Sequence, residues 1–171
     1  MNLQITAAID AIDAIDRQLL IALQTDASRT NQDLAGHCGL SPATCLRRVA
    51  RLRARGFIAS QVAVLDADRL ASVLGHGLTA LIDVTLDRQD AESLDAFETR
   101  AVADDAVQQC YRVSPGPDFV LVVHTADMPA HLALTQRLLT SDANVRNTKT
   151  HFSVKRAKFK PKVLISPAPA T

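Results

Sequence analysis

The sequence contains no tryptophan, and aromatic side chains make up only 4% of its 171 residues. The hydrophobic cores must therefore consist mainly of leucine, valine, isoleucine and alanine. With hydrophobic residues at 47% and charged residues at 22%, the composition is that of a globular protein and excludes a disordered chain. No apolar run approaches the ~20 residues that a membrane-spanning helix needs, so we expect no membrane partner.

Cysteine is also scarce. Cys38, Cys45 and Cys110 lie far apart, and none of them forms a CxxC pair. An odd number of cysteines without such spacing argues against a disulfide framework and against a structural zinc site. We interpret all three as buried thiols in a reducing compartment. The first residues carry acids and no basic stretch, so we expect no secretion signal and a cytoplasmic protein.

Recognisable catalytic motifs are missing as well. The five histidines, at positions 37, 76, 124, 131 and 151, have no serine, cysteine or acidic partner at a familiar spacing. There is no glycine-rich phosphate loop and no HExxH sequence. The sequence therefore predicts a protein that is not an enzyme and that uses neither a cofactor nor a metal. A metal-responsive protein using His37, Cys38 and Cys45 is a less favoured alternative.

Acidic residues are absent from one stretch of the chain. The net charge is only +1, but the segment between Pro42 and Gly56 carries five arginines and no acid. Such local asymmetry says more about binding partners than the total charge does, and it predicts an anionic partner for this segment.

Capping residues divide the N-terminal region into three short helices. Asp13 is the expected N-cap of the first, which ends near Gln24, and Thr30 or Asn31 begins the second, which ends near His37. Gly39 ends that helix. The third begins with Ser41 as N-cap and Pro42 at its first position and ends near Arg55, where Gly56 closes it. A short helix, a tight turn with glycine and a longer helix predict a DNA-binding helix-turn-helix.

A helical wheel of the third helix separates two faces. Cys45, Leu46, Val49 and Leu52 are expected to pack on the other helices. The opposite face would enter the major groove, with residues near the helix start touching bases and the arginines gripping phosphates. Backbone N–H groups at the start of the second helix can also bind a phosphate. The predicted DNA-binding residues are Thr30, Asn31, Ser41, Pro42, Thr44, Arg47, Arg48, Arg51 and Arg55.

The second half of the chain alternates strands and helices. Strands are expected at 79–86, 107–114, 119–124 and 145–154, and helices at 89–103 and 128–140, the latter with Leu132, Leu134 and Leu138 inward. This β-α-β-β-α-β order predicts a ferredoxin-like domain, an antiparallel sheet with both helices on one face, and hence an α+β fold class. The apolar strands imply that a second subunit covers the other face in a homodimer.

The predicted organisation has four parts. Residues 1–65 form the helix-turn-helix domain, including an extended segment at 57–65 that serves as a wing or connecting strand. Residues 66–78 form a linker, residues 79–155 the ferredoxin-like domain, and residues 156–171 a basic, proline-rich tail. Residues 163–165 of that tail could add an edge strand.

Several ordered stretches resemble the leucine-responsive/AsnC (feast/famine) family of transcription regulators. In the first half these are Asp13-Ala14-Ile15-Asp16-Arg17 and the run from Gly39 to Val49, continued by Arg55-Gly56-Phe57-Ile58. In the second half Cys110-Tyr111-Arg112-Val113-Ser114, Asp118-Phe119-Val120-Leu121 and Asn144-Val145-Arg146 resemble its effector domain. The resemblance covers about residues 12 to 160.

The resemblance implies a sequence-specific regulator of transcription that binds double-stranded DNA. It further implies a homodimer that assembles to tetramers or octamers, with an amino acid or related metabolite bound at or near the interface between dimers. A metabolite-binding module without a specific DNA target is the alternative. Carried over to this chain, the effector-binding residues would be Tyr111, Val113, Ser114, Gly116, Asp118, Phe119, Thr148 and Thr150.

The effector loop departs from the family pattern at one point. The family commonly has Gly-x-x-Asp after the serine, whereas here the order is Ser114-Pro115-Gly116-Pro117-Asp118, and two prolines stiffen the turn. The loop could therefore suit a different ligand or none. Asp118 could bind a ligand ammonium group or could instead cap the turn.

Overall fold

A computed structural model describes residues 12–75 and 77–166. The chain divides into two compact units, one of residues 1–64 with 159–171 and the other of residues 65–158, and each has its own buried cluster. The predicted absence of a secretion signal concerns residues 1–11, which lie outside the described residues, as does His76.

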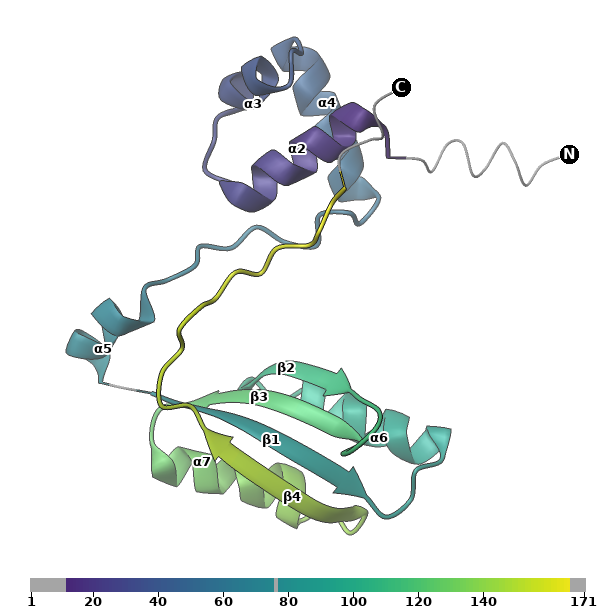
Figure 1. Cartoon of the computed structure of the whole chain (residues 1–171), viewed down its shortest axis with the longest axis vertical. Helices are drawn as coiled ribbons and strands as arrows, with labels where there is room; N and C mark the ends of the chain where they lie inside the picture. The colour runs from purple at the N-terminus through teal and green to yellow at the C-terminus, as the bar shows by residue number, and fades with distance from the viewer. Residues whose placement is uncertain (1–11, 76, 167–171) are drawn as a thin grey trace, which may run out of the picture. The chain divides into compact units, whose positions relative to one another are not determined.

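The described residues of the first unit form three helices (Figure 1). A side-chain cap begins each of them. Their bounds are α2 (Ala14–Thr25), α3 (Asn31–His37) and α4 (Pro42–Ala54). Asp13, Thr30 and Ser41 each accept a hydrogen bond from the backbone N–H three residues further on, as the sequence predicts. Gly39, at φ 64°, adopts the left-handed conformation that turns the chain between α3 and α4.

The core of the first unit takes two residues of α2, two of α3 and three of α4. They are Leu19, Ala22, Leu34, Ala35, Cys45, Val49 and Leu52. The prediction that Leu46 packs in this core is wrong, because 62% of its surface is exposed. Cys45, Val49 and Leu52 follow one another at spacings of four and three and complete the buried stripe, and Leu46 lies beyond its edge.

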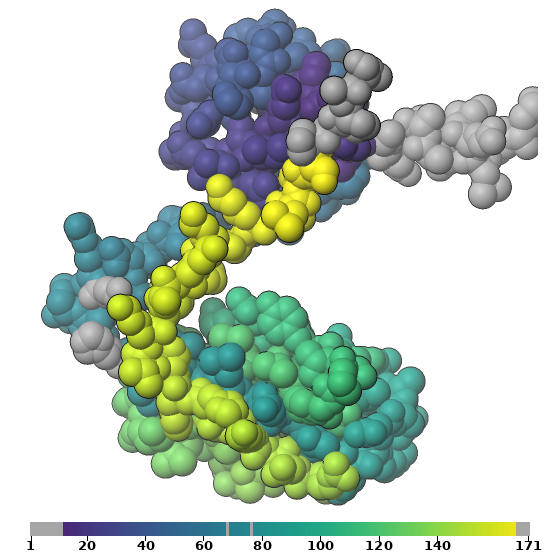
Figure 2. Space-filling model, viewed as in Figure 1, coloured from purple at the N-terminus to yellow at the C-terminus, as the bar shows by residue number. Residues whose placement is uncertain are grey.

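Two extended segments of the first unit are not strands. Residues 57–65, predicted as a wing or connecting strand, carry no strand hydrogen-bonding, and neither does the tail at 163–165. Val163 instead exchanges two hydrogen bonds with the side-chain amide of Gln24, at 3.0 and 3.1 Å, so the tail segment lies against α2 (Figure 2). A side-chain amide can offer the same donor and acceptor that a neighbouring strand would offer.

The second unit has a four-stranded antiparallel sheet in the order β2-β3-β1-β4. After the short helix α5 (Ala67–Leu74), its elements are β1 (Leu78–Leu86), α6 (Ala91–Val102), β2 (Val107–Arg112), β3 (Phe119–Thr125), α7 (Met128–Thr135), the π-helical turn η1 (Gln136–Thr140) and β4 (Val145–Phe152). The predicted α+β class and β-α-β-β-α-β order are confirmed.

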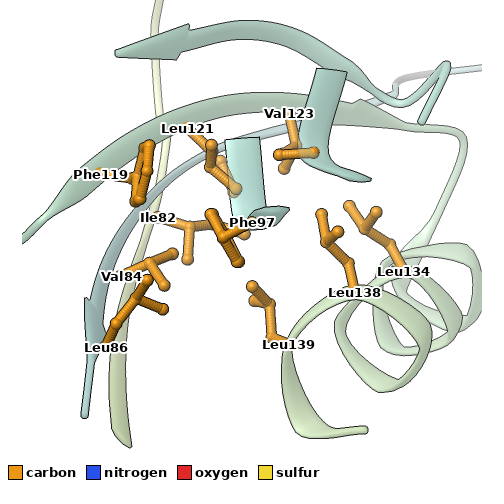
Figure 3. Packing of buried hydrophobic residues seen from close by; sticks show 12 residues of the cluster. Ile82, Val84, Leu86, Phe97, Phe119, Leu121, Val123, Leu134, Leu138 and Leu139 are labelled. Carbon is orange, nitrogen blue, oxygen red and sulfur yellow. The ribbon is translucent and has the colours of Figure 1, made fainter. Parts of the chain in front are cut away.

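Both α6 and α7 lie on the same face of the sheet (Figure 1). Side chains from both helices meet β1 and β3 in one apolar cluster (Figure 3), in which the rings of Phe97 and Phe119 are 4.8 Å apart. The prediction that Leu132 points inward is wrong, because 61% of it is exposed. The buried positions of this helix and its π turn are His131, Leu134, Leu138 and Leu139.

The other face of the sheet has no covering element in its own unit. Along β1 the side chains alternate, so Ile82 and Val84 are buried under the helices whereas Leu81 is exposed on the open face. The strand register places Val122 beside Leu81 on this face, and Tyr111 beside Val120. The open face therefore has an apolar centre.

Candidate functional site

The small polar residues predicted to touch DNA lie at the starts of α3 and α4. The side-chain amide of Asn31 donates to the backbone oxygen of Pro42 at 2.8 Å, which ties the start of α3 to the start of α4. The hydroxyl of Ser41 donates to that of Thr44 at 2.9 Å. Thr30 forms a capping box with Asp33. The hydrogen bond from Asn31 thus brings the start of α3 to the N-terminus of α4, where Ser41 and Thr44 lie.

Two of the predicted DNA-binding arginines are joined to acids at the start of α2. Arg48 Nη1 lies 2.6 Å from Asp13 Oδ2 and 2.9 Å from Asp16 Oδ1, and Arg51 Nη2 lies 2.5 Å from Asp16 Oδ2. The Asp16 side chain is only 1% exposed, whereas those of Arg48 and Arg51 are 22% and 47% exposed. One buried carboxylate therefore forms ion pairs with two arginines of α4.

This network fixes α4 against α2 electrostatically. Partial burial opposes ionisation of Asp13, but hydrogen bonds from the Asp16 backbone N–H and from Arg48 outweigh it and lower the pKa of Asp13. Hydrogen bonds to the carboxylates of Asp13 and Asp16 raise the pKa of Arg48, so Asp13 and Arg48 are both held in their charged forms. Sequence reasoning missed the pairing. The signal available was a spacing of three on both helices, between the two acids and between the two arginines.

The two remaining arginines of α4 and the C-cap Arg55 differ in their surroundings. Arg53 donates a hydrogen bond to Gln61, and the guanidinium of Arg55 lies 5.0 Å from the ring centre of Phe57. Arg47 is exposed, and no ion pair joins it to another residue in the described part of the chain. Among the arginines of α4, Arg47 is thus the one least involved in contacts within its own unit.

The predicted effector loop is closed by Asp118. Its backbone N–H donates to Val84 O at 2.9 Å, and its backbone oxygen accepts from the N–H of Val113 at 3.0 Å. Its carboxylate accepts hydrogen bonds from the Leu86 backbone N–H at 2.7 Å and from Gln89 Nε2 at 3.2 Å. The side chain therefore serves as an anchor that ties the loop to the end of β1. Ser114 and Gly116 lie exposed between these attachments.

The other predicted effector residues do not converge within one chain. Tyr111, on β2, lies on the open face and donates to Gln109 Oε1 at 2.9 Å, while the side chain of Phe119 lies in the core. Thr148 and Thr150 are on β4, at the opposite edge of the sheet, about 14 Å from β2 at three strand spacings. Thr148 lines a small pocket with Arg146 beside η1.

The described residues give little support to a metal site. No three histidine, cysteine or acidic side chains group together among them, and burial raises the pKa of the Cys38 and Cys45 thiols, which disfavours the thiolate that metals bind. Within the same residues, no helix is both long and apolar enough to cross a membrane.

Family models match both units. One described as the AsnC-type helix-turn-helix domain matches residues 12–53, and one described as the Lrp/AsnC ligand binding domain matches residues 79–163. The chain belongs to the Lrp/AsnC family. It is a transcription regulator with a DNA-binding and a ligand-binding domain, and the predicted family is confirmed.

Relatives of similar length agree with this assignment. The chain is 31% identical over 154 residues to the leucine-responsive regulatory protein of Escherichia coli, covering 90% of this chain and 92% of that protein. It is 33% identical over 144 residues to an uncharacterised HTH-type transcriptional regulator of Haemophilus influenzae, covering 84% and 83%.

Solved structures agree as well. An AsnC family regulator from Agrobacterium tumefaciens superposes with a TM-score of 0.76 at 26% identity, covering 89% of this chain and 96% of the other. A transcriptional regulator from Neisseria meningitidis in complex with L-Met also gives 0.76 at 26% identity, covering 90% and 97%.

Proposed function

We propose that this Lrp/AsnC regulator binds its operator through the outer face of α4 and that an amino acid modulates its DNA binding or assembly. The observation that carries the proposal is that α4 is capped at Ser41, packed through one face and exposed on the other, with Arg47 on the exposed face. A helix in this state presents its first turns to the major groove.

The DNA contacts that we propose fall into two groups. Ser41, Pro42, Thr44 and Arg47 lie in the first turns of α4, where a helix reaches base edges and nearby phosphates. Arg51, Arg55 and the start of α3 at Thr30 and Asn31 supply phosphate contacts further out. Arg48 and Arg51 first hold α4 in place through Asp16, and the guanidinium of Arg51 is exposed enough to touch a phosphate at the same time.

The effector is proposed to be an amino acid. The regulator from Neisseria meningitidis was crystallised with L-Met, and the Escherichia coli relative is named for its response to leucine. The exposed loop at Ser114 and Gly116 offers backbone N–H groups for a carboxylate. Because Tyr111 and Thr148 lie at opposite edges of the sheet, the predicted residues can share one ligand only if two subunits contribute them.

The open face of the sheet is proposed to form a homodimer, from which tetramers or octamers are built. Leu81, Val122 and Tyr111 would otherwise leave an apolar patch in water, which a soluble protein seldom tolerates. Replacing Leu81 by Asp is expected to give monomers by light scattering. The control change Leu132→Asp, at a leucine of α7 that is 61% exposed against 41% for Leu81, should leave the dimer intact.

We further infer that the chain acts by binding and not by catalysis, in the bacterial cytoplasm where the operator lies. His124 bonds to Thr79, His131 lies in the apolar core, and His151 pairs with Asp83 at 3.9 Å on the open face. These placements serve packing and pairing, and none of them assembles a nucleophile with a base.

The deciding experiment is a mobility shift with the DNA upstream of the chain's own gene and of its divergent neighbour, with amino acids added one at a time. We expect tight, salt-sensitive binding, and Arg47→Ala should weaken it. Arg69→Ala, at an exposed arginine of α5, is the control and should change nothing. If a folded dimer binds none of these DNAs above the level of unrelated DNA, and none from a random pool, the DNA-binding proposal fails.

A further inference from the structure

Leu46 is a large apolar side chain on the exposed face of the recognition helix. With 62% of its surface exposed, it contributes little to the core that Cys45, Val49 and Leu52 build. At 100° per residue, Leu46 points about 90° away from the middle of that core, and Ala50, Ala43 and Arg47 follow it round the helix to the direction opposite to the core. All four are exposed, and we call them the outer strip of α4.

The cations beside the outer strip are largely engaged in holding the helix. Arg48 and Arg51 are paired with Asp16, Arg53 bonds to Gln61, and Arg55 lies over Phe57. The outer strip therefore carries one arginine, Arg47, among three apolar side chains. A surface that binds the DNA backbone without regard to sequence would instead carry several cations, because contacts with phosphate groups depend on positive charge.

The chemistry of this strip matches base edges in the major groove. Thymine presents its C5-methyl group there, which apolar side chains contact, and guanine presents O6 and N7, which arginine binds in a bidentate manner. We propose that Leu46 is a specificity-determining residue that contacts a thymine methyl group, and that Arg47 binds a guanine close to it. This inference rests on the proposed binding of DNA through α4 and names the bases that it prefers.

The test begins with duplexes selected from a random pool by the full-length protein. In the best selected duplex, each thymine is replaced in turn by deoxyuridine, which differs only by lacking the C5-methyl group. We expect at least one position where this change weakens binding of the unaltered protein about fourfold, the effect of one buried methyl-sized group. Leu46→Ala should bind the original duplex more weakly and should show no penalty for deoxyuridine at that position.

Arg47→Ala tests the second half of the proposal. It should lose the preference for one G·C pair near the sensitive thymine, because a bidentate arginine–guanine contact discriminates by about one order of magnitude or more. The penalty for deoxyuridine should remain. Leu132→Ala is the matched control, since this leucine is 61% exposed on the surface of the other unit, and it should leave both preferences unchanged.

The possible failures are distinguishable. If the unaltered protein selects no duplex, DNA binding itself fails, and the inference fails with it. If it selects a duplex but Leu46→Ala keeps the same base preferences and the same deoxyuridine penalty, Leu46 does not contact a thymine. If Leu46→Ala changes only the oligomeric state by light scattering, the leucine belongs to a protein–protein contact, and the inference is again overturned. Thermal unfolding followed by circular dichroism shows that the variants are folded.

Discussion

Replacing Asp16 by asparagine tests the ion-pair network that holds the recognition helix in place. The change keeps the size of the side chain and removes its charge. Two charge-assisted hydrogen bonds, from Arg48 at 2.9 Å and from Arg51 at 2.5 Å, are weakened or lost. Both arginines are partly exposed and can turn to water, and Arg48 keeps its contact with Asp13 at 2.6 Å. We therefore expect the first unit to lose about 2 kcal/mol of unfolding free energy, which is in the range for hydrogen bonds to charged groups.

Removing the arginines instead should cost more. In the double variant Arg48→Ala/Arg51→Ala, the Asp16 carboxylate stays buried at 1% exposure without either cation. Removing the partners of a buried charge costs about 3–5 kcal/mol. The triple variant that also carries Asp16→Ala should recover part of this loss, because it no longer buries an uncompensated charge.

Urea unfolding followed by circular dichroism measures these differences, and thermal melting should follow the same order. For a unit of this size, about 2 kcal/mol corresponds to a shift of about 10 °C in Tm. The reasoning is refuted if the double variant is no less stable than Asp16→Asn, or if the triple variant is less stable than the double. Either result would mean that Asp16 is not desolvated in the folded unit.

Three further predictions concern the second unit. Phe97→Ala empties the centre of its core and should cost about 3–5 kcal/mol in urea unfolding; a loss below about 1 kcal/mol would contradict the packing. Hydrogen bonds from Arg137 lower the pKa of Asp104. The stabilisation that this pair gives the fold is therefore fully present above the ordinary carboxyl pKa of 3.8, and it is lost as the pH falls through the lowered pKa. Asp104→Asn should therefore flatten the acid side of the stability profile, by less than about 1 kcal/mol because the pair is partly exposed, and an unchanged profile would exclude the pairing. Asp118→Ala leaves the Leu86 N–H without its acceptor and should lower stability by about 1–2 kcal/mol even without any effector, whereas a purely ligand-binding role predicts no change in the ligand-free protein.

The sequence by itself determined the elements and their order. Asp13, Thr30 and Ser41 begin their helices where predicted, and Gly39 turns the chain between α3 and α4. These features depend on interactions within a few residues, such as a side chain capping the N–H three positions away, so they can be recognised locally. The order of strands and helices likewise indicated a sheet with both helices on one face.

Only the tertiary structure decided how the functional face of α4 is composed. Arg48 and Asp16 are 32 residues apart in sequence, and their pairing depends on the angle at which α4 crosses α2, which no local pattern specifies. The same angle decides that Leu46 lies outside the core, since the apolar character of a residue does not say which neighbouring helix will cover it. The hydrogen bond of Asp118 likewise depends on the tertiary structure, because the fold brings the end of β1 to the loop and so supplies the Leu86 N–H that the carboxylate accepts.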